Sequence, residues 1–395
     1  MPGPLADIFV LDLSRVLAGP FCTMILADLG AEVVKVERPG TGDDSRAFSP
    51  MKGSESAYFM SINRGKKSIT VNMKNPRGRE IILNLARHAD VVIENFKPGV
   101  MKRLGLSYDT LRQVNPRLVY ASSTGYGQTG PFSEKAAYDL IIQGMSGMMS
   151  ITGPDENHPT KAGSSIADIF SGVFTCIGIL SALRARERTG EGQMVDVAML
   201  DCVFSVLENA VARYMASGVV PKPIGNLHPS IAPFSSFSTS DGQINIAVGN
   251  DSLWIKFCEA IGREDLLNDE RYGSNDLRIT NLDSLMITLN DTLSRRGSKH
   301  WLNLFEKTGI PAGKVDNIAE VLQNPQIIAR DMLVSLVHPT AGEHTVPGIP
   351  IKFSSTKAAI KKSAPLLGEH NKEILVGLLG MSNDELSELE DEGVI

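Results

Sequence analysis

Asp139 is the first residue of this chain whose type and position suggest chemistry. It stands in the segment AAYDLIIQGMSGMMS, directly after Tyr138 and shortly after a glycine-rich stretch. A carboxylate near the start of a helix usually caps that helix or is solvated. It can also act as a nucleophile toward an activated acyl group. Asp139 is therefore the candidate nucleophile, and the other motifs of the sequence decide how far that interpretation holds.

A second group of residues indicates an anion site. Basic side chains recur at or just beyond the ends of expected strands, and the run Glu94-Asn95-Phe96-Lys97-Pro98-Gly99 ends one of these strands. The carboxyl ends of parallel strands form the crevice in which α/β proteins bind ligands. One lysine at such a place is normally solvated surface, whereas several that converge would bind phosphates. The basic residues concerned are Arg38, Lys66, Lys67, Lys97, Lys102 and Arg103.

The stretch Gly125-Tyr126-Gly127-Gln128-Thr129-Gly130 fits the pattern G-x-G-x-x-G of dinucleotide-binding proteins. Its context does not fit, because Pro131 and a charged segment follow where a helix should begin and bind a pyrophosphate. The first strand–helix–strand unit has Ala18-Gly19-Pro20 instead of the glycine pattern. We therefore expect no nucleotide redox cofactor.

Composition describes an ordinary globular protein. The 395 residues include 42% hydrophobic and 21% charged residues and carry a net charge of −6, without a run of Lys and Arg, so no general nucleic-acid binding is expected. The four cysteines are scattered singly, without the spacing of a zinc site, and no metal is expected. No basic leader and no stretch of about 18 uninterrupted apolar residues is found. This predicts a protein without membrane association that stays in the cytoplasm or reaches an organelle by a signal missing here.

The first half of the chain alternates strand and helix patterns. Apolar or β-branched runs alternate with segments of helical spacing, which predicts a mostly parallel sheet covered by helices. The expected strands are 9–13, 31–36, 68–71, 91–94, 118–122 and 194–197, and the expected helices are 20–29, 78–88, 138–149, 166–185 and 200–215.

The amino-acid composition changes in the Gly- and Pro-rich stretch 217–231, which indicates a linker to a smaller domain. That domain opens with a hairpin of strands 234–239 and 243–248 around Asp241-Gly242, and helices are expected at 253–261, 282–293 and 300–308. A strand at 332–337 and a last helix at 371–379 complete the tail. We predict a large Rossmann-like α/β domain over residues 1–216, a linker and small α+β domain over 217–330, and a C-terminal segment over 331–395 that returns to the large domain.

Many separate motifs of this sequence occur in the same order as in one known protein family. The sequence contains LDLSRVLAGPFCTMILADLGAEVVKVERPGTGDDSR, NRGKKSITVNMKNPRGRE, VVIENFKPGVMKRLGLSY, GYGQTGP, AAYDLIIQGMSG, GEGQMVDVAMLD, GIPAGKV and PLLGEH. From about Leu5 to the C-terminus it resembles the class III CoA-transferase family, also called CaiB/BaiF. The resemblance implies a CoA site, a Rossmann-like large domain with a small domain, and a homodimer of interlocked rings.

The family resemblance implies two chemistries on one scaffold. In the transferase branch the aspartate at the position of Asp139 is the nucleophile. In the branch similar to 2-methylacyl-CoA racemases, a histidine occupies the position of Tyr138 and works with an acid at the position of Asp168. A phenol with a pKa near 10 is a poor substitute for an imidazole, so the sequence favours the transferase and leaves Asp168 a structural role. A racemase and a non-catalytic CoA-binding protein remain the alternatives.

The resemblance also implies which residues contact CoA. Carried over to this chain they are Leu17, Ala18, Arg38, Val71, Asn95, Phe96, Lys97 and Arg103. Cationic side chains suit the phosphates of CoA and apolar ones suit its adenine. Some relatives have Gln at the position of Leu17 and Lys at that of Thr124, so this chain lacks two polar contacts.

The sequence looks nearest to the branch that uses succinyl-CoA and dicarboxylates such as glutarate, with itaconate a further candidate acceptor. A second carboxylate needs a cation, and Arg46 in GDDSR is the first candidate to bind it; the alternative for Arg46 is a surface ion pair with Asp43 or Asp44. Other substrate contacts are expected from a small group, in which Gly249 is a candidate oxyanion or lid element. This group is Tyr138, His228, Ser230 and Gly249.

Overall fold

The computed structural model describes residues 2–395 and divides the chain into two compact units. Unit 1 comprises Met1–Met149, Lys161–Val219 and Pro325–Ile395, and unit 2 comprises Ser150–Thr160 and Val220–Asn324. The predicted domain boundaries after residues 216 and 330 lie within a few residues of two of these divisions. The excursion Ser150–Thr160 differs from the prediction, because it groups with unit 2 although it was expected inside the large domain.

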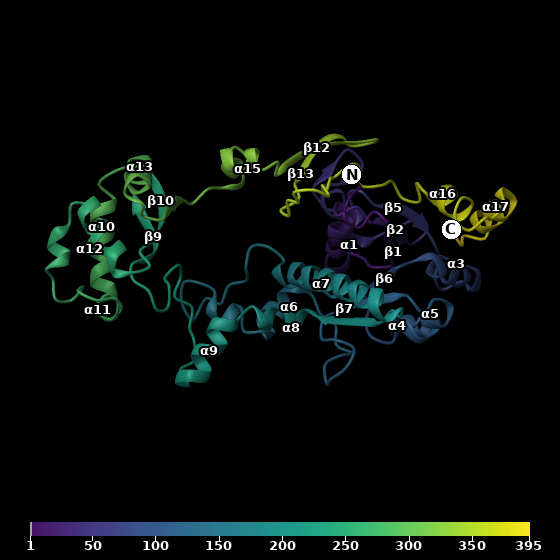
Figure 1. Ribbon diagram of the computed structural model, residues 1–395, viewed down its shortest axis with the longest axis horizontal. Coiled ribbons are helices and arrows are strands. Elements are labelled where there is room, and N and C mark those ends of the chain that lie inside the picture. Colours follow the sequence, from purple (N-terminus) through teal and green to yellow (C-terminus); the bar gives the residue numbers. More distant parts are fainter. Residues whose placement is uncertain (1) are drawn as a thin grey trace. The chain divides into compact units, whose positions relative to one another are not determined.

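Unit 1 is built on a six-stranded parallel sheet (Figure 1). Its order is β5-β2-β1-β6-β7-β8, so the chain starts in the middle, proceeds to one edge, and then returns to build the other half. This order is that of the Rossmann fold, with its topological switch point between β1 and β6. The strands are β1 (Phe9–Asp12), β2 (Glu32–Glu37), β5 (Lys67–Thr70), β6 (Val91–Glu94), β7 (Val119–Thr124) and β8 (Met194–Ala198).

Helices cover both faces of this sheet, as the predicted pattern of buried strands requires. Alternate residues of each strand enter different cores: Leu11 packs with α3 (Pro76–His88), whereas Val10 packs with α1 (Ala18–Asp28) and α7 (Ile166–Thr189). The sequence prediction of a Rossmann-like large domain with a parallel sheet is confirmed.

The tail returns to unit 1 and completes its core. Helices α16 (Asn371–Leu375) and α17 (Asn383–Asp391) pack beside α3 on one face of the sheet (Figure 1). The expected helix 371–379 is shorter than predicted, and α17 was missed. Its signal was present, because Ser382 and Glu385 form a capping box.

The remaining elements of unit 1 are short and lie in the connections between strands. The predicted helix 200–215 is interrupted at Val206 and Leu207, where α8 ends and α9 begins. These elements are η1 (Asp44–Ala47), β3 (Met51–Lys52), β4 (Glu55–Ser56), α2 (Ala57–Ile62), α4 (Val100–Arg103), α5 (Tyr108–Val114), α6 (Asp139–Met145), α8 (Met199–Ser205), α9 (Glu208–Ser217), α15 (Pro325–Ala329), β12 (Leu333–His338) and β13 (Gly342–Pro347). A short helix, η2 (Met149–Ile151), stands at the division between the units.

Helix α7 is long and apolar enough to span a membrane by length and composition alone. In unit 1, however, Cys176 and Ile179 of this helix lie in the core over β1, β6 and β7. The apolar character of α7 is thus explained by its place on the sheet.

Unit 2 is an α+β unit with its own core. Its antiparallel sheet has the order β11-β10-β9, and the hairpin predicted around Asp241-Gly242 is present. Phe237, Trp254 and Phe305 belong to its core. Its elements are β9 (Phe234–Thr239), β10 (Gly242–Ala247), β11 (Ala312–Lys314), α10 (Asp251–Ala260), η3 (Glu264–Leu267), α11 (Asn275–Thr280), α12 (Leu282–Leu293), α13 (Ser298–Thr308) and α14 (Ile318–Val321).

The first prediction concerns the returning tail. Leu389 of α17 is buried in the core against the sheet, so Leu389→Ala should lower the free energy of unfolding by about 2–5 kcal/mol. Glu390→Ala, at the exposed neighbouring position, should change it by less than about 0.5 kcal/mol. Chemical denaturation of both variants measures the difference. Equal stabilities would show that α17 does not belong to the cooperative core of unit 1.

Candidate active site

A cavity of about 510 Å³ opens at the carboxyl ends of the central strands of unit 1. Its lining comes from the segments that follow β1, β2, β5 and β6, which places it at the topological switch point, where α/β folds bind ligands. Basic and apolar side chains alternate around it. The lining includes Leu13, Arg15, Arg38, Thr41, Val71, Met73, Lys74, Phe96, Val100 and Leu104.

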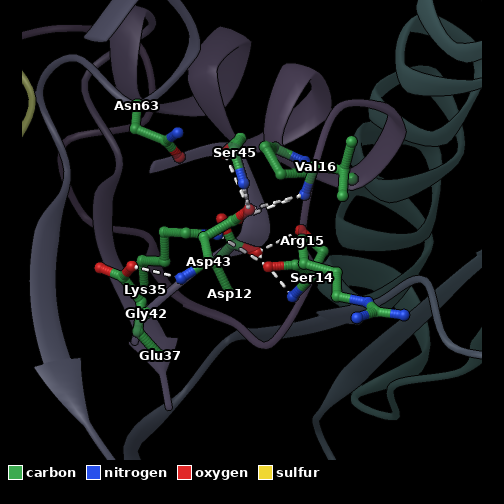
Figure 2. Close-up of polar contacts among 12 residues, drawn as sticks. Asp12, Ser14, Arg15, Val16, Lys35, Glu37, Gly42, Asp43, Ser45 and Asn63 are labelled. Carbon is green, nitrogen blue, oxygen red and sulfur yellow. Dashed lines mark hydrogen bonds and ion pairs between the residues drawn. The ribbon is translucent and has the colours of Figure 1, made fainter. Parts of the chain in front are cut away.

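A buried ion pair, drawn in Figure 2, belongs to the lining of this cavity. Lys35 Nζ lies 2.8 Å from Asp43 Oδ2, and both side chains are inaccessible to solvent. Burial alone would raise the pKa of Asp43, but the Lys35 ammonium holds it well below its usual range. Burial alone would likewise lower the pKa of Lys35, but Asp43 raises it. Both groups are therefore charged at neutral pH.

The carboxylate of Asp43 also organises two backbone segments. It accepts hydrogen bonds from the backbone N–H of Val16 (3.1 Å) and of Ser45 (2.9 Å), as Figure 2 shows. Val16 has a φ of 66°, which is a strained value for a β-branched residue. The Asp43 contact compensates this strain and fixes the turn between β1 and α1.

A second buried pair holds the start of α1. Lys66 Nζ lies 3.1 Å from Asp12 Oδ2 and donates to the carbonyl oxygen of Pro20 and to Asn63 Oδ1. Burial lowers the pKa of Lys66 to about 8, although Asp12 opposes this change. Thr23 Oγ1 donates to the same carboxylate over 2.6 Å. These contacts tie the first helix to the end of β1.

Gly19 is needed at the same junction. A Cβ atom at this position would lie 2.2 Å from Ser14 Cβ, so only glycine allows α1 to approach the loop after β1 this closely. The Ala-Gly-Pro sequence, which differs from a dinucleotide fingerprint, thus has a packing reason.

Charged side chains surround the mouth of the cavity. Asp44 accepts hydrogen bonds from Arg38 and from Arg15, the latter over 2.7 Å, and all three are substantially exposed. In Figure 2 the Arg15 guanidinium points away from the buried network. Surface pairs of this kind are weak, so an anionic ligand can compete with Asp44 for either arginine.

The residues predicted to contact CoA fall into three groups. Arg38, Val71 and Phe96 line the cavity. Asn95 joins two of its loops, because its side chain accepts from the Arg15 N–H (2.9 Å) and donates to the Arg15 carbonyl (2.8 Å).

The other predicted contacts flank the cavity. Leu17 and Ala18 are buried at the start of α1. Lys97 and Arg103 are exposed, and their side chains form no hydrogen bond or ion pair with any of residues 2–395.

Arg46 forms an ion pair that the sequence did not indicate. Its guanidinium pairs with both carboxylate oxygens of Glu37, each at 2.7 Å, and lies 3.8 Å from the centre of the Phe59 ring. Its partner is thus Glu37 rather than Asp43 or Asp44, and its side chain is only 13% exposed. To bind a substrate carboxylate it would have to leave Glu37. The acceptor role of Arg46 remains a prediction, and its evident role is structural.

Asp139 is the first residue of α6, and its carboxylate is held on both oxygens. Oδ1 accepts from the backbone N–H of Ala167 over 2.9 Å, and Oδ2 accepts from Gln143 Nε2 over 2.7 Å. Ala167 lies in the first turn of α7, whose N-terminus favours negative charge. The arrangement orients a half-buried carboxylate without a cationic partner among residues 2–395.

Three carboxylates act on one phenol next to this site. Burial raises the pKa of Tyr58 to about 12, and nearby negative charges add to the effect. These charges belong to Asp168, Asp43 and Asp139. Tyr58, which the sequence analysis missed, thus lies within the electrostatic influence of the candidate nucleophile and of Asp43. No local motif marked it.

Comparison with known proteins now decides the family. Residues 5–371 match the sequence profile described as CoA-transferase family III. The chain belongs to CoA-transferase family III. The resemblance inferred from its motifs is confirmed, and the chain is an enzyme of this transferase class.

Relatives of this family III enzyme match along nearly its whole length. It is 46% identical over 353 residues to acetyl-CoA:oxalate CoA-transferase of Acetobacter aceti, covering 89% of this chain and 90% of the relative. It is 40% identical over 393 residues to succinyl-CoA:glutarate CoA-transferase of Mus musculus, covering 99% and 90%. The crystal structure of a CaiB/BaiF family protein from Brucella suis is similar with a TM-score of 0.87 and 41% identity, covering 96% and 100%.

The remaining predicted substrate contacts of this family III enzyme lie in unit 2. His228 Nδ1 accepts from the backbone N–H of Ser230 over 3.1 Å, and its ring lies 5.1 Å from that of Phe234. Gly249 follows β10 and precedes Asn250, the N-cap of α10. The roles expected for these residues beside Asp139 remain predictions.

Metal ligands are not gathered anywhere in the described chain. Among residues 2–395 no group of three or more His, Cys, Asp or Glu side chains could hold a metal ion. The expectation of metal-free chemistry remains a prediction, as does the expectation that no nucleotide redox cofactor is used.

The second prediction uses the pH dependence of Asp168. Burial and, next, the charge of Asp139 raise the pKa of Asp168 to about 7. The folded protein therefore keeps a proton that the unfolded chain releases, and stability falls by at most about 1.4 kcal/mol per pH unit between pH 4 and 7. Asp168→Asn removes this loss, so it should be more stabilising at pH 8 than at pH 5.

Denaturation of both proteins at the two pH values checks this expectation, with Asp7→Asn as the control at an exposed carboxylate. A stability difference between Asp168→Asn and the wild type that does not change with pH would contradict the raised pKa.

Proposed function

We propose that this enzyme moves CoA from succinyl-CoA to a dicarboxylic acid such as glutarate or itaconate, with Asp139 as the nucleophile. The observation that carries the proposal is the Asp139 carboxylate, which is oriented by a hydrogen bond to each of its oxygens. The two named relatives act on oxalate and glutarate, according to their names, which supports a dicarboxylate acceptor.

The cavity suits the nucleotide part of CoA. Val71 and Phe96 offer apolar surface for the adenine, while Arg38 and Lys74 offer positive charge to the phosphates. Lys97 and Arg103 are exposed and have no partner among residues 2–395, so a phosphate would not have to displace an existing ion pair there. Leu17 and Ala18 then contact the ligand from the start of α1, and Asn95 keeps the two loops together.

The proposed reaction proceeds through covalent intermediates on Asp139. An oxygen of Asp139 attacks the thioester carbonyl of the donor, a C–O bond forms, and the C–S bond breaks to release CoA thiolate. The thiolate then attacks Cγ of Asp139, which yields an aspartyl-CoA thioester and releases the donor carboxylate.

The acceptor completes the exchange. Its carboxylate attacks Cγ, and the C–S bond breaks to give a second mixed anhydride and CoA thiolate. The thiolate attacks the acceptor carbonyl of this anhydride and restores the Asp139 carboxylate. No oxidant and no ATP is consumed. Exclusion of water is essential, because a mixed anhydride hydrolyses readily.

Racemisation is the less favoured alternative. Asp168 has a pKa of about 7, which suits proton transfer, but a racemase needs a second base at position 138. Tyr138 supplies a phenol whose side chain is 75% exposed. Asp168 could therefore act as one base, but position 138 supplies no second base for the opposite face of the substrate.

Acceptor recognition is proposed for residues that can bind a second carboxylate. Tyr138 lies beside the nucleophile, while His228, Ser230 and Gly249 come from unit 2. Arg46 would join them only if its pairing with Glu37 opened. A cytoplasmic location is proposed as well, since the substrates are soluble anions.

The third prediction tests Asp139 as the nucleophile. Asp139→Ala should abolish CoA transfer, with a loss of at least about 10⁴-fold in kcat, because no covalent intermediate can form. CoA affinity should change little, and the protein should remain folded. In the wild type, hydroxylamine or borohydride trapping with succinyl-CoA should label Asp139, as peptide mass spectrometry would show.

Asp7→Asn serves as the unchanged control. Turnover by Asp139→Ala or a label on another residue would exclude this mechanism. Exchange of the α-hydrogen of 2-methylacyl-CoA in deuterium oxide, without transfer to an acid, would indicate the racemase. CoA binding without transfer to any of a panel of mono- and dicarboxylic acids would indicate the non-catalytic alternative.

We also propose that two chains form an interlocked homodimer. Helix α9 buries none of its ten residues, and large apolar side chains are exposed along α6 to α9. Exposed apolar surface on this scale usually marks an interface. The chain also passes between the two units four times, which is the connectivity that a linked ring needs. The exposed residues include Leu140, Ile141, Met145, Ile177, Phe204, Tyr214 and Met215.

The fourth prediction is that the dimer is obligate. Light scattering at micromolar concentration should give twice the mass of one chain, and Met215→Glu on α9 should weaken assembly because it places a charge in the proposed apolar interface. Lys222→Glu, a surface change in unit 2, is the control. A monomer that retains full activity would contradict the proposal.

A further inference from the structure

Gln143 is a buried side chain that no motif explains. It lies one helical turn after Asp139 on α6 and is completely inaccessible to solvent. Its Nε2 donates to Asp139 Oδ2 over 2.7 Å, and its Oε1 accepts from the backbone N–H of Ala162 over 2.9 Å. Both ends of the amide are thus satisfied, which a buried glutamine requires.

The contact with Ala162 fixes which end of the amide faces the nucleophile. A backbone N–H can only donate, so it selects Oε1, and Nε2 must then point at Asp139. Ala162 is the second residue after the chain re-enters unit 1 at Lys161. The re-entering segment therefore sets the orientation of the amide, and the amide sets that of the carboxylate.

Two donors now define the plane of the carboxylate. The Ala167 N–H binds Oδ1 and the Gln143 amide binds Oδ2, so rotation about the Cβ–Cγ bond of Asp139 would break both hydrogen bonds. Each oxygen keeps a lone pair for other partners. The carboxylate is thus restrained while one of its oxygens remains able to attack.

We propose that Gln143 is a positioning residue for the proposed CoA transfer, holding Asp139 in one orientation through every covalent state. This inference rests on the proposed function and adds to it. In each step at Cγ, one C–O or C–S bond forms, the other breaks, and the oxygen that stays bonded to Cγ alone bears the negative charge of the tetrahedral intermediate. A fixed N–H donor stabilises such an oxygen.

The contact suits all of these states because an amide N–H can donate both to a carboxylate and to the carbonyl of an anhydride or thioester. It is neutral, so it does not tie the nucleophile in an ion pair. A cation in its place would stabilise the free carboxylate and so reduce its reactivity toward the thioester.

The test compares Gln143→Leu with Gln143→Glu. Gln143→Leu removes both hydrogen bonds and should lower kcat by about 10²-fold, with the KM for acyl-CoA changed by less than about threefold. Gln143→Glu keeps the shape and the acceptor for the Ala162 N–H but loses the donor. At pH 8 it should be at least as impaired as Gln143→Leu.

Acid should rescue Gln143→Glu. Two carboxylates in hydrogen-bond contact share one proton, and the protonated member can donate to the other. The kcat of Gln143→Glu should therefore rise at least about tenfold between pH 8 and pH 6, relative to the wild type. Gln143→Leu should show no such rise. A merely structural role for Gln143 would not predict this difference.

Gln113→Glu, at an exposed position on α5 of the same unit, is the matched control and should behave as the wild type. Circular dichroism establishes folding; if Gln143→Leu is unfolded, the pH profile of the isosteric Gln143→Glu decides. Near wild-type kcat in the folded variants, or a change confined to KM, would overturn the inference.

The rate of the Asp139 adduct, followed by quenched-flow mass spectrometry, separates this inference from the proposed function. If the wild type forms no adduct at Asp139, the proposed function fails. If the wild type and Gln143→Leu form it equally fast, the function stands and the role of Gln143 is refuted.

Discussion

The buried ion pair between Lys35 and Asp43 is the interaction on which the arrangement of unit 1 depends. Two charges without solvent access are costly to bury, and they are tolerated because hydrogen bonds complete the coordination of both. Lys35 also donates to the carbonyl oxygen of Ser14, and Asp43 accepts from the strained Val16. One pair therefore joins β2, the loop after it and the turn after β1. Removing either partner would leave an unpaired buried charge and release the walls of the cavity.

Hydrogen bonds and burial distinguish the environments of two aspartates, Asp139 and Asp168. Asp139 has a donor on each oxygen, from α6 and from the first turn of α7. Asp168, one residue after Ala167, is half-buried, and this burial together with the charge of Asp139 raises its pKa to about 7. The start of α7 thus gives two neighbouring carboxylates different environments, one with a hydrogen-bond donor on each oxygen and one with a raised pKa.

The tail illustrates why the fold is not a sum of local units. His370 and Asn371 bind the backbone of β5, at the edge of the sheet, through contacts that span about 300 residues of sequence. Ser68, in the same strand, donates to Glu37, which is the partner of Arg46. The C-terminal segment consequently covers an otherwise open sheet edge and supports the loop that bears Asp43. An acceptor role for Arg46 must be weighed against this structural one.

Local pattern by itself determined the strands, the parallel sheet and the hairpin of unit 2. These features depend on apolar periodicity and short motifs, which a sequence displays directly. The sequence also showed that three charged residues, Asp12, Lys35 and Glu37, lie inside strands, although it did not reveal their partners. Only the tertiary structure decided that Arg46 pairs with Glu37 and that Gln143 donates a hydrogen bond to Asp139. Each of these contacts depends on where distant backbone segments come together, and a side chain's type does not reveal which partner the fold will bring to it.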